Sequence, residues 1–350
     1  IGGGVIGSST AWHLASLGYQ VILIDPLLNQ SFSRSHQLNG TSASLGILMG
    51  NIFKRANGRS WRLRQQSMKL WTTWISLLNT PETPLHLDTP LIRLASSEKE
   101  AYSMQKLSNE RSSLGLELLP SNTTTGLGRL WPKHNYGGLI SHKDGRIDPL
   151  KLQQCLFNGL KKFNVTRRNT TVISLKRESA TKLRQWNIHL ASGEIINQDI
   201  VIICAALGSE ALLEPLGYNN PMTAILGQAL NLKLRKDNKD WSGWPAVLVS
   251  QGINLIPNGE NHIYIGATLE PGTTPSINAI EQIKTMHGNA PSWLNTAAIT
   301  EKWSGLRGKP LQEPAPLMKK LEAGLIMATG HYRNGILLAP ANAEWVAEEV

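Results

Sequence analysis

The chain has 350 residues, of which 41% are hydrophobic and 17% are charged, a composition typical of globular proteins. This length suffices for one large α/β domain or for two interleaved domains. No segment approaches the roughly 20 consecutive apolar residues that a membrane helix needs, so we exclude an integral helical membrane protein and expect no membrane partner.

The formal net charge is +10, from 35 Lys and Arg against 25 Asp and Glu. Such an excess can serve nucleic acid, an anionic surface or a site for anionic ligands. The basic residues are scattered, and even the densest stretch, Lys54–Arg64, is typical of a solvated helix face. We therefore do not expect nucleic acid as the main partner.

Cysteine and histidine contribute no recognisable metal or redox motif. Cys155 and Cys204 lie far apart without a C-x-x-C pattern, and the nine histidines show no metal-ligand spacing. We expect no disulfide and no bound metal. This cysteine usage is typical of a reducing compartment, so we expect a cytoplasmic protein.

The first segment, IGGGVIGSSTAWHLASLGYQVILID, matches G-x-G-x-x-G at Gly2, Gly4 and Gly7. Apolar residues then recur at helical spacing up to Gly18, and a buried strand ends at Asp25. In a dinucleotide fold the first glycine permits a tight turn, the second lets the backbone approach a pyrophosphate, and the third lets helix and strand pack closely. The helix N-terminus attracts the anion, and Asp25 can accept hydrogen bonds from ribose hydroxyls. These residues predict a bound dinucleotide.

The identity of the dinucleotide does not follow from the glycines alone, because the pattern serves NAD, FAD and, more loosely, methyl-donor cofactors. A plain NAD dehydrogenase would continue with alternating strands and helices. This chain continues with a polar loop and the segment GTSASLGILMG. Ile1 would be the last residue of the first strand, so we expect the natural chain to have residues upstream of it.

The rest of the chain predicts one long helix and several strands. Ser60–Leu78 is rich in Trp and Leu, which suits a core helix better than the interface of a homo-oligomer, although it is compatible with both. ASGE (Ala191–Glu194) predicts a hairpin turn, and DIVIICA predicts a buried strand that leads to Gly208, where the backbone can approach a ligand. INLIPNGENHIYIGAT predicts two strands joined by an Asn-Gly turn. GHYRNGILLAP (Gly330–Pro340) predicts a glycine turn that carries an arginine and an asparagine ahead of a buried helix.

These segments, in this order, resemble the D-amino-acid-oxidase superfamily of FAD enzymes, and within it the chain looks most like the glycine oxidases of thiamine biosynthesis. The similarity runs through GGGVIGSSTAWHLASLG, GTSASLGIL, GGLISHKDGRIDPLKL, VIICAALGSEA, NLIPN…IYIGATLEPG, WSGLRGKP and GHYRNGILLAP. It implies an α/β fold (α+β overall) in which an FAD-binding dinucleotide fold with a parallel sheet is interleaved with an antiparallel-sheet substrate domain. The implied FAD-binding domain is discontinuous, with residues 1–80, 141–220 and 318–350, and the substrate-binding domain comprises residues 81–140 and 221–317.

The resemblance implies FAD as the cofactor. The glycine turn, the first helix and Asp25 would hold the ADP half, Thr41 and Ser42 would face the pyrophosphate and ribitol, and the last glycine turn would donate backbone N–H groups to the flavin ring. The implied cofactor-binding residues are Gly2, Gly4, Val5, Ile6, Gly7, Asp25, Thr41, Ser42, Leu45, Gly46, Ile47, Val172, Gly208, Asn334, Gly335, Ile336 and Leu337.

The resemblance also implies the substrate contacts and the reaction. Arg307 in WSGLRGKP would pair with a substrate carboxylate, the alternative being an internal salt bridge, and Arg333 would project toward the substrate. The implied reaction is oxidative deamination of glycine or of a small amino acid or secondary amine by hydride transfer to flavin N5. It gives a 2-oxo acid, ammonia and, with molecular oxygen as the acceptor, hydrogen peroxide. Positioning suffices, so no catalytic acid or base is assigned.

Three residues depart from the glycine oxidase pattern. Asn254 stands where a tyrosine usually contacts the substrate carboxylate, Asn258 replaces an arginine, and Gly308 replaces the proline after Arg307. These changes concern the substrate rather than FAD, so two alternatives stay open. One is a flavin dehydrogenase or oxidase of a bulkier amine, and the other is an FAD-dependent enzyme that modifies tRNA, whose binding would weaken as salt rises.

Overall fold

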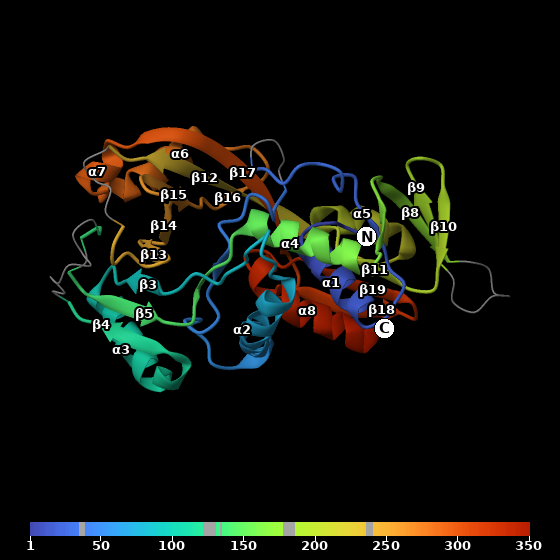
Figure 1. The fold of residues 1–350 in the computed structure, drawn as a ribbon, viewed down its shortest axis with the longest axis horizontal. Coiled ribbons are helices and arrows are strands. Elements are labelled where there is room, and N and C mark those ends of the chain that lie inside the picture. The colour runs from blue at the N-terminus through green and yellow to red at the C-terminus, as the bar shows by residue number, and fades with distance from the viewer. Residues whose placement is uncertain (35–38, 122–130, 134, 178–185, 236–240) are drawn as a thin grey trace.

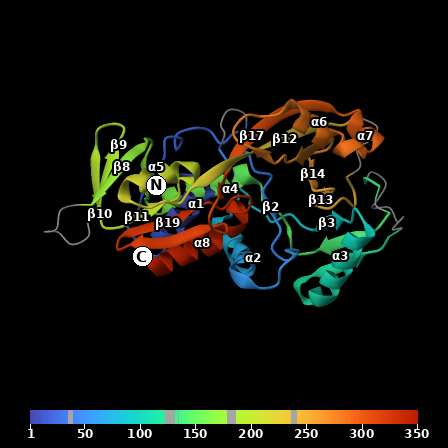
Figure 2. The ribbon, with the colours of Figure 1, turned by 180° about the vertical axis from the view of Figure 1, so that it is seen from behind.

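The computed structural model describes residues 1–34, 39–121, 131–133, 135–177, 186–235 and 241–350. Figures 1 and 2 show an elongated molecule with two halves. One half contains both labelled ends of the chain, and the other contains a large sheet with helices α3, α6 and α7. The mixed helix and sheet fold predicted from the sequence is confirmed, whereas the division into alternating domain segments stays a prediction.

In the half that contains the chain ends, the first residues complete a parallel layer. The backbone nitrogen of Ile1 donates to the Ile202 carbonyl at 2.8 Å, and Cys204 N–H donates to the Ile1 carbonyl at 2.8 Å. On the other side, Gly2 N–H donates to the Ile24 carbonyl at 2.9 Å. Ile1 and Gly2 therefore take the place of a first strand between two pairs of parallel strands. One pair is β1 (Ile22–Ile24) with β7 (Thr166–Arg168), and the other is β11 (Val201–Ile203) with β19 (Leu325–Thr329). Beyond β19, the strand β18 (Leu317–Glu322) pairs antiparallel.

Four helices pack together beside this layer. They are α1 (Val5–Ser16), α2 (Gly58–Leu78), α4 (Pro149–Lys162) and α8 (Gly335–Glu349), with α1 contacting α4 and α8, and α8 contacting α2. The indole of Trp71 is fully buried and donates to the Leu337 carbonyl at 3.1 Å. Trp74 meets Trp12 edge to face, with ring centroids 4.7 Å apart. The predicted core role of the long helix is therefore confirmed.

The other half is built on a nine-stranded sheet. Its strands pair in the order β16, β12, β15, β14, β13, β3, β5 and β4, and β17 pairs with β12 along most of its length. The strands are β3 (Leu91–Leu94), β4 (Leu116–Leu119), β5 (Gly138–Ser141), β12 (Met222–Lys233), β13 (Val247–Ser250), β14 (Ile253–Asn258), β15 (His262–Gly266), β16 (Glu270–Pro271) and β17 (Ala298–Pro310). The predicted hairpin with the Asn-Gly turn is confirmed as β14 and β15.

Both faces of this sheet are covered, because its central strands bury side chains on each side. Leu248, Leu255 and Ile265 belong to a core with α6 (Ile277–Lys284) and α7 (Ser292–Asn295). Val247, Ile256 and Tyr264 belong to a second core, shared with α3 (Glu98–Glu110) and with Leu45 from the other half. The sheet is thus packed against the segment around Leu45, which lies between β1 and β2.

Smaller elements complete the fold. An antiparallel sheet of β8 (Val172–Arg177), β9 (Trp186–Leu190) and β10 (Ile195–Gln198) includes the hairpin predicted at ASGE. The short strands β2 (Ile47–Leu48) and β6 (Gly145–Arg146) pair antiparallel, although about 100 residues separate them along the chain. The helix α5 (Ser209–Leu213) follows β11. No helix of the described residues is both long enough and apolar enough to cross a membrane.

A buried chain of hydrogen bonds joins α1 to the residues around α8. His331 Nε2 lies 3.1 Å from Asn342 Oδ1, Asn342 Nδ2 donates to Thr10 Oγ1 at 3.3 Å, and Thr10 donates to the Ile6 carbonyl at 2.8 Å. Burial lowers the pKa of His331 to about 4. The imidazole is therefore neutral at physiological pH and donates its Nε2–H to the asparagine.

This pKa predicts a stability change with pH. An unfolded histidine takes up a proton near pH 6.5, whereas folded His331 does so only near pH 4, so the free energy of unfolding falls as pH is lowered through that window. The loss should be about 3 kcal/mol. His331→Gln should remove that part of the slope in chemical denaturation between pH 7 and pH 4. Identical pH dependence in the variant and the parent would contradict this assignment.

Candidate cofactor and substrate site

The three glycines of the first turn let α1 pack directly on the first strand. A Cβ at Gly7 would lie 1.8 Å from the Gly2 carbonyl oxygen. Gly2 has a φ of 106°, and a Cβ there would lie 2.5 Å from the Cys204 carbonyl oxygen. Side chains at these two positions would separate helix from strand, which supports the roles predicted for Gly2 and Gly7.

Asp25 lies at the end of β1, beside the start of α1. Its carboxylate accepts hydrogen bonds from Gly3 N–H at 2.7 Å and from Leu27 N–H at 2.8 Å. It also lines a small cavity together with Ser42 and Gln153. The structure therefore places Asp25 beside the N-terminus of α1, as predicted from the sequence.

The segment after the polar loop is held on both sides. Thr41 Oγ1 accepts from Val5 N–H at 2.9 Å, and Ser42 Oγ exchanges hydrogen bonds with the Gln153 amide on α4. Trp303 Nε1 on β17 donates to the Ala43 carbonyl at 2.9 Å. This segment therefore connects the N-terminus of α1 to the large sheet.

The backbone turns sharply at Gly46, which has a φ of 76°. A Cβ there would lie 1.8 Å from the Ile147 carbonyl oxygen, so only glycine fits. On either side, the Leu45 carbonyl accepts from Arg146 Nε at 3.0 Å, and Ile47 pairs with Arg146 in β2–β6. The predicted contacts Leu45, Gly46 and Ile47 thus form one rigid stretch.

The N-terminus of α8 lies against the N-terminus of α1. A Cβ at Gly335 would lie 3.6 Å from Val5 Cγ1. The N-cap residues Gly4 and Asn334 provide no side-chain cap, and the first turns contain no acidic residue. In contrast, the N-cap side chains of α3, α4 and α6 accept hydrogen bonds from their own helices. At α1 the Val5 N–H donates to Thr41 Oγ1, but neither helix is capped by its own N-cap side chain. Two positive dipole ends therefore converge, which suits an anionic or electron-rich ligand.

The remaining predicted cofactor residues differ in their surroundings. Ile6, Ile336 and Leu337 are buried in the core around these helices, and Val172 is the buried first residue of β8. Gly208 has an ordinary φ of −74°, and its Cβ direction meets only Ala205 Cβ, at 3.8 Å. No steric constraint in the described residues demands glycine there, so its cofactor contact stays a prediction.

Arg307 and Asn254 both donate to the backbone at the end of β15, within residues 266–268. Arg307 Nη1 donates to the Thr268 carbonyl at 3.2 Å, and Asn254 Nδ2 donates to the Gly266 carbonyl at 2.8 Å. The Arg307 guanidinium lies over Gly227, where a Cβ would be 2.2 Å from Nη2. Burial lowers the pKa of Arg307, the charge of Arg333 lowers it further, and Tyr332 and Glu270 act in the opposite direction. No carboxylate of the described residues forms an ion pair with Arg307, which disfavours the internal salt bridge.

Arg333 lies on the turn before α8. Its side chain is exposed, and Tyr332 before it has a left-handed φ of 54°. The charge of Arg333 lowers the pKa of Arg307. The shared substrate role of the two arginines stays a prediction.

The expectation that Lys54–Arg64 forms a solvated helix face is wrong at both ends of this stretch. The helix α2 begins only at Gly58, and Arg64 at the other end is buried. Arg64 is only 8% exposed and packs over the Phe53 ring, 4.1 Å from its centroid. Its Nη1 donates to the Met49 carbonyl at 3.0 Å and its Nη2 to Asn334 Oδ1 at 2.9 Å. A basic residue among other basic residues carries no local signal of such burial, so sequence reasoning missed it.

Sequence reasoning also missed Asp144, although the Asp-Gly pair at this position is a turn signal. Its carboxylate is fully buried and accepts from the N–H groups of Gly50, Asn51 and Ile52 at 2.9–3.1 Å. Burial raises the pKa of Asp144, and these hydrogen bonds oppose the rise. Asp144 therefore shapes the backbone that follows β2.

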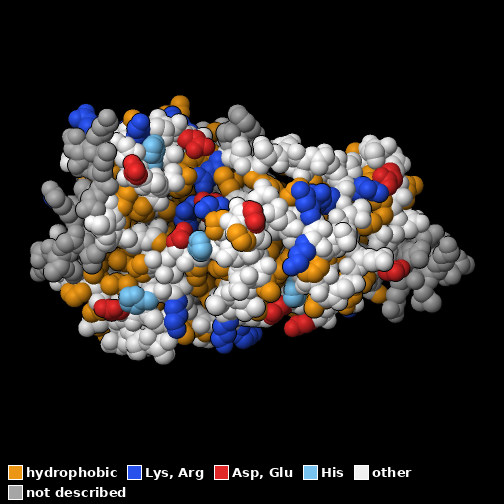
Figure 3. All heavy atoms as spheres, in the orientation of Figure 1, with side chains coloured by type: hydrophobic (Ala, Val, Ile, Leu, Met, Phe, Trp, Pro, Cys, Tyr) orange, Lys and Arg blue, Asp and Glu red, His pale blue; other side chains and the backbone are white. Residues whose placement is uncertain are grey.

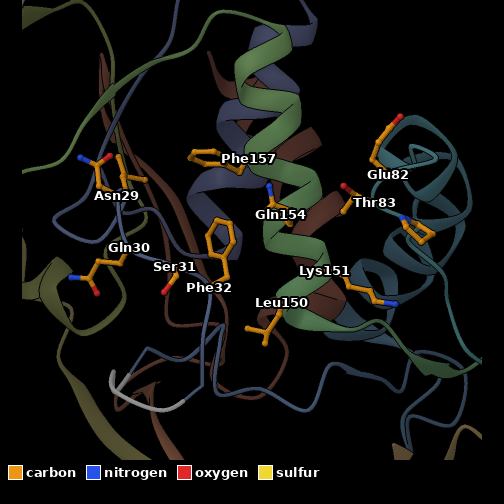
Figure 4. A pocket seen from close by; sticks show the side chains of 12 residues that line it. Asn29, Gln30, Ser31, Phe32, Glu82, Thr83, Leu150, Lys151, Gln154 and Phe157 are labelled. Carbon is orange, nitrogen blue, oxygen red and sulfur yellow. The ribbon is translucent and has the colours of Figure 1, made fainter. Parts of the chain in front are cut away.

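A cavity of about 870 Å³ lies beside the Asp25 cavity. Figure 4 shows that its side chains come from the segment after β1, from α4 and from the segment around Glu82 and Thr83. Phe32 and Phe157 meet edge to face within it, with ring centroids 5.8 Å apart. Leu28, Ser31 and Phe157 line both cavities, so the larger one is an open extension of the Asp25 cavity.

Within the described residues, no group of three or more His, Cys, Asp or Glu side chains is arranged to hold a metal ion. Cys155 and Cys204 are both free and buried. Burial raises the pKa of Cys204 to about 11, so its thiol stays protonated at neutral pH.

The glycine turn, Asp25 and the two converging helix ends define a dinucleotide-dependent enzyme. The chain belongs to the family of FAD dependent oxidoreductases (DAO), whose sequence profile matches residues 1–349. This match confirms the predicted FAD-dependent enzyme of the amino-acid oxidase type.

Three relatives align with nearly the whole of this chain. A glycine oxidase of Bacillus licheniformis is 24% identical over 100% of this chain and 91% of that protein. The bifunctional protein ThiO/ThiG of a Nostoc species is 28% identical over 99% of this chain, which spans about half (51%) of that protein. The crystal structure of glycine oxidase from Geobacillus kaustophilus has a TM-score of 0.83 at 21% identity and covers 99% of this chain and 92% of that chain.

The residues fit FAD. The close contact of Gly2 and Gly7 brings the N-terminus of α1 to the end of the first strand, where it would face a pyrophosphate, and Asp25 would accept from a ribose hydroxyl. The α8 N-terminus, which has no cap and no acid, suits a ring that gains negative charge on reduction.

Gly7→Ala should therefore impair FAD binding, because its Cβ would collide with the Gly2 carbonyl and move the helix end. We expect the purified variant to retain less than about one-tenth of the parent's FAD content, since such packing is part of the dinucleotide site. Visible absorbance per protein measures this content. Ser16→Ala, at the exposed end of the same helix, is the control, and circular dichroism checks folding. Full FAD content in Gly7→Ala would refute the assignment.

Proposed function

We propose that this FAD-dependent oxidoreductase catalyses the oxidative deamination of glycine or of a small amino acid or secondary amine. The observation that carries the proposal is Arg307. Arg307 is partly buried, its guanidinium lies over Gly227, and it forms no ion pair with a carboxylate of the described residues. A fork of parallel N–H donors of this kind matches the two oxygens of a carboxylate.

In this proposal Arg307 anchors the substrate carboxylate and thereby orients the α-carbon. The hydrogen bond from Arg307 to the Thr268 carbonyl holds the guanidinium in place, so less conformational entropy is lost when the carboxylate binds. The positive charges of Arg307 and Arg333 disfavour a protonated amine beside them, and the neutral amine is the form that can lose hydride. FAD, when bound, supplies the acceptor for that hydride.

The resulting imine would be hydrolysed by water to a 2-oxo acid and ammonia. Molecular oxygen would take up the two electrons and two protons as hydrogen peroxide, so the reaction balances as amino acid, oxygen and water giving 2-oxo acid, ammonia and peroxide. With glycine the 2-oxo acid is glyoxylate. The buried free thiols Cys155 and Cys204 support a cytoplasmic location.

A second candidate is a bulkier amino acid or secondary amine, and the conformation of Asn254 favours it. The Asn254 amide donates to the Gly266 carbonyl and is only 8% exposed, so it is engaged within the sheet. A side chain held in this way leaves room that a longer residue at this position would occupy. The cofactor and the arginine anchor are the same in both candidates.

Anaerobic titration of the flavin-loaded protein tests the reaction and separates the candidates. Glycine, sarcosine and D-alanine are added in turn while the visible flavin absorbance is followed. Bleaching by at least one of them is expected, since hydride transfer removes this absorbance. A flavin that dithionite bleaches and no amino acid or secondary amine does would refute the proposed reaction.

Replacement of Arg307 tests the anchor. Arg307→Met should weaken substrate binding by about 2–5 kcal/mol, as for loss of one partner of a buried charged pair. The measurement is the substrate concentration that gives half-maximal flavin reduction. Lys309→Met removes the same charge from an exposed position on the same strand and should leave this concentration within about twofold, because exposed charges contribute little. Equal behaviour of the two variants would refute the role of Arg307.

A further inference from the structure

Arg64 is a buried cation for which the structure provides hydrogen bonds but no counter-ion. It lies on α2 and donates only to neutral acceptors, the Met49 carbonyl and Asn334 Oδ1. Its Nε is buried and has no hydrogen-bond partner among the described residues. A guanidinium in this setting loses hydration without gaining a charged partner, which is costly unless an anion is supplied.

The nearest acidic group does not neutralise it. The charge of Asp144 acts on Arg64, yet the Asp144 carboxylate accepts from the N–H groups of residues 50–52 and forms no ion pair with an arginine of the described chain. Burial lowers the pKa of Arg64 to about 10, so the guanidinium still carries its charge at neutral pH.

Arg333 connects Arg64 with the proposed carboxylate anchor. It directly precedes Asn334, which accepts the hydrogen bond from Arg64. The charge of Arg333 adds to the effect of burial in lowering the pKa of both Arg64 and Arg307. Figure 3 shows Lys and Arg side chains gathered in a hollow between the two halves of the molecule.

Glu270, whose charge acts on Arg307, is also engaged elsewhere. The Glu270 carboxylate accepts from Gln228 Nε2 at 2.9 Å and from Ser276 N–H at 2.6 Å, and it also bonds Thr268 Oγ1. Arg64 contacts Asn334, Arg333 is the residue before it, and neither they nor Arg307 form an ion pair with a carboxylate of the described residues. One monocarboxylic substrate would satisfy Arg307 and leave the other two without an anion.

We propose that Arg64 and Arg333 form a second anion subsite, so that the preferred substrate is an amine with two carboxylates, one bound by Arg307 and the other by this pair. The inference rests on the proposed function, because it assumes that Arg307 anchors the first carboxylate. It adds a specificity-determining residue, Arg64, and a substrate class, the dicarboxylic amines. In such a complex the two carboxylates of the substrate bind at the two ends, and its amine lies between them.

The test compares two unreactive ligands that differ only in the second carboxylate. Diglycolate is the ether analogue of iminodiacetate, and methoxyacetate is the ether analogue of sarcosine. Each is titrated into the FAD-loaded protein by calorimetry at neutral pH and low salt. We expect diglycolate to bind about 10- to 100-fold more tightly, since charge-assisted hydrogen bonds from a buried arginine strengthen binding by about that factor.

The matched variants are Arg64→Met and Arg62→Met, which remove the same charge from the same helix at a buried and an exposed position. Arg64→Met should reduce the preference for diglycolate to within about threefold of unity, whereas Arg62→Met should keep it. Arg64→Lys, which keeps the charge and the fold, should retain an intermediate preference. Equal binding of the two ligands by the parent, or an unchanged preference in Arg64→Met, overturns the inference.

Two further outcomes separate this inference from the proposed function. If methoxyacetate and diglycolate bind equally while sarcosine still bleaches the flavin, the proposed reaction stands and the second subsite is refuted. If neither ligand binds and no amine bleaches the flavin, both proposals fail. A loss of FAD from Arg64→Met with the ligand preference unchanged would assign Arg64 to the cofactor instead, and would also overturn the inference.

Discussion

The structure depends on two helix N-termini that meet, neither of them capped by the side chain of its own N-cap residue. An uncapped N-terminus leaves N–H donors and a partial positive charge exposed to whatever lies in front of it. Here α1 and α8 begin side by side, at Val5 and Gly335, and neither end has an acid or a capping side chain of its own. The contacts around them explain why the arrangement persists. The Gly2–Gly7 contact holds α1 against the first strand, and the Thr10, Asn342 and His331 chain holds α1 to α8.

The electrostatics of the site follow from the same arrangement. Two positive helix ends converge, and Arg64 donates to Asn334 at the start of one of them. The acids whose charges act on Arg64 and Arg307 are satisfied by other groups, Asp144 by backbone N–H groups and Glu270 by Gln228, Thr268 and Ser276. Neither of these carboxylates forms an ion pair with an arginine of the described residues.

Local patterns predicted much of this fold from the sequence. The spacing of Gly2, Gly4 and Gly7 reflects a contact within one strand–helix unit, and the Asn-Gly turn between β14 and β15 reflects a preference of two residues. The missed features are non-local. The burial of Arg64 depends on Asn334, which lies at the other end of the chain, and the pairing of Ser42 with Gln153 joins segments that no short pattern connects. The parallel pairing of β13 with β3 is also invisible in either strand alone.

The meeting of α1 with α8 has a consequence for the order in which the protein becomes functional. Val5 is synthesised well before Gly335, because more than 300 residues separate them along the chain, so the ribosome releases one of these helix ends long before the other exists. Bringing such distant segments together is slow, because the entropy of closing the loop is lost before the contacts form. In the meantime β11 lacks its partner β19, which leaves a strand edge open to other chains. Cofactor uptake must therefore be a late event in the life of each molecule, and the unfinished chain is the form most exposed to aggregation.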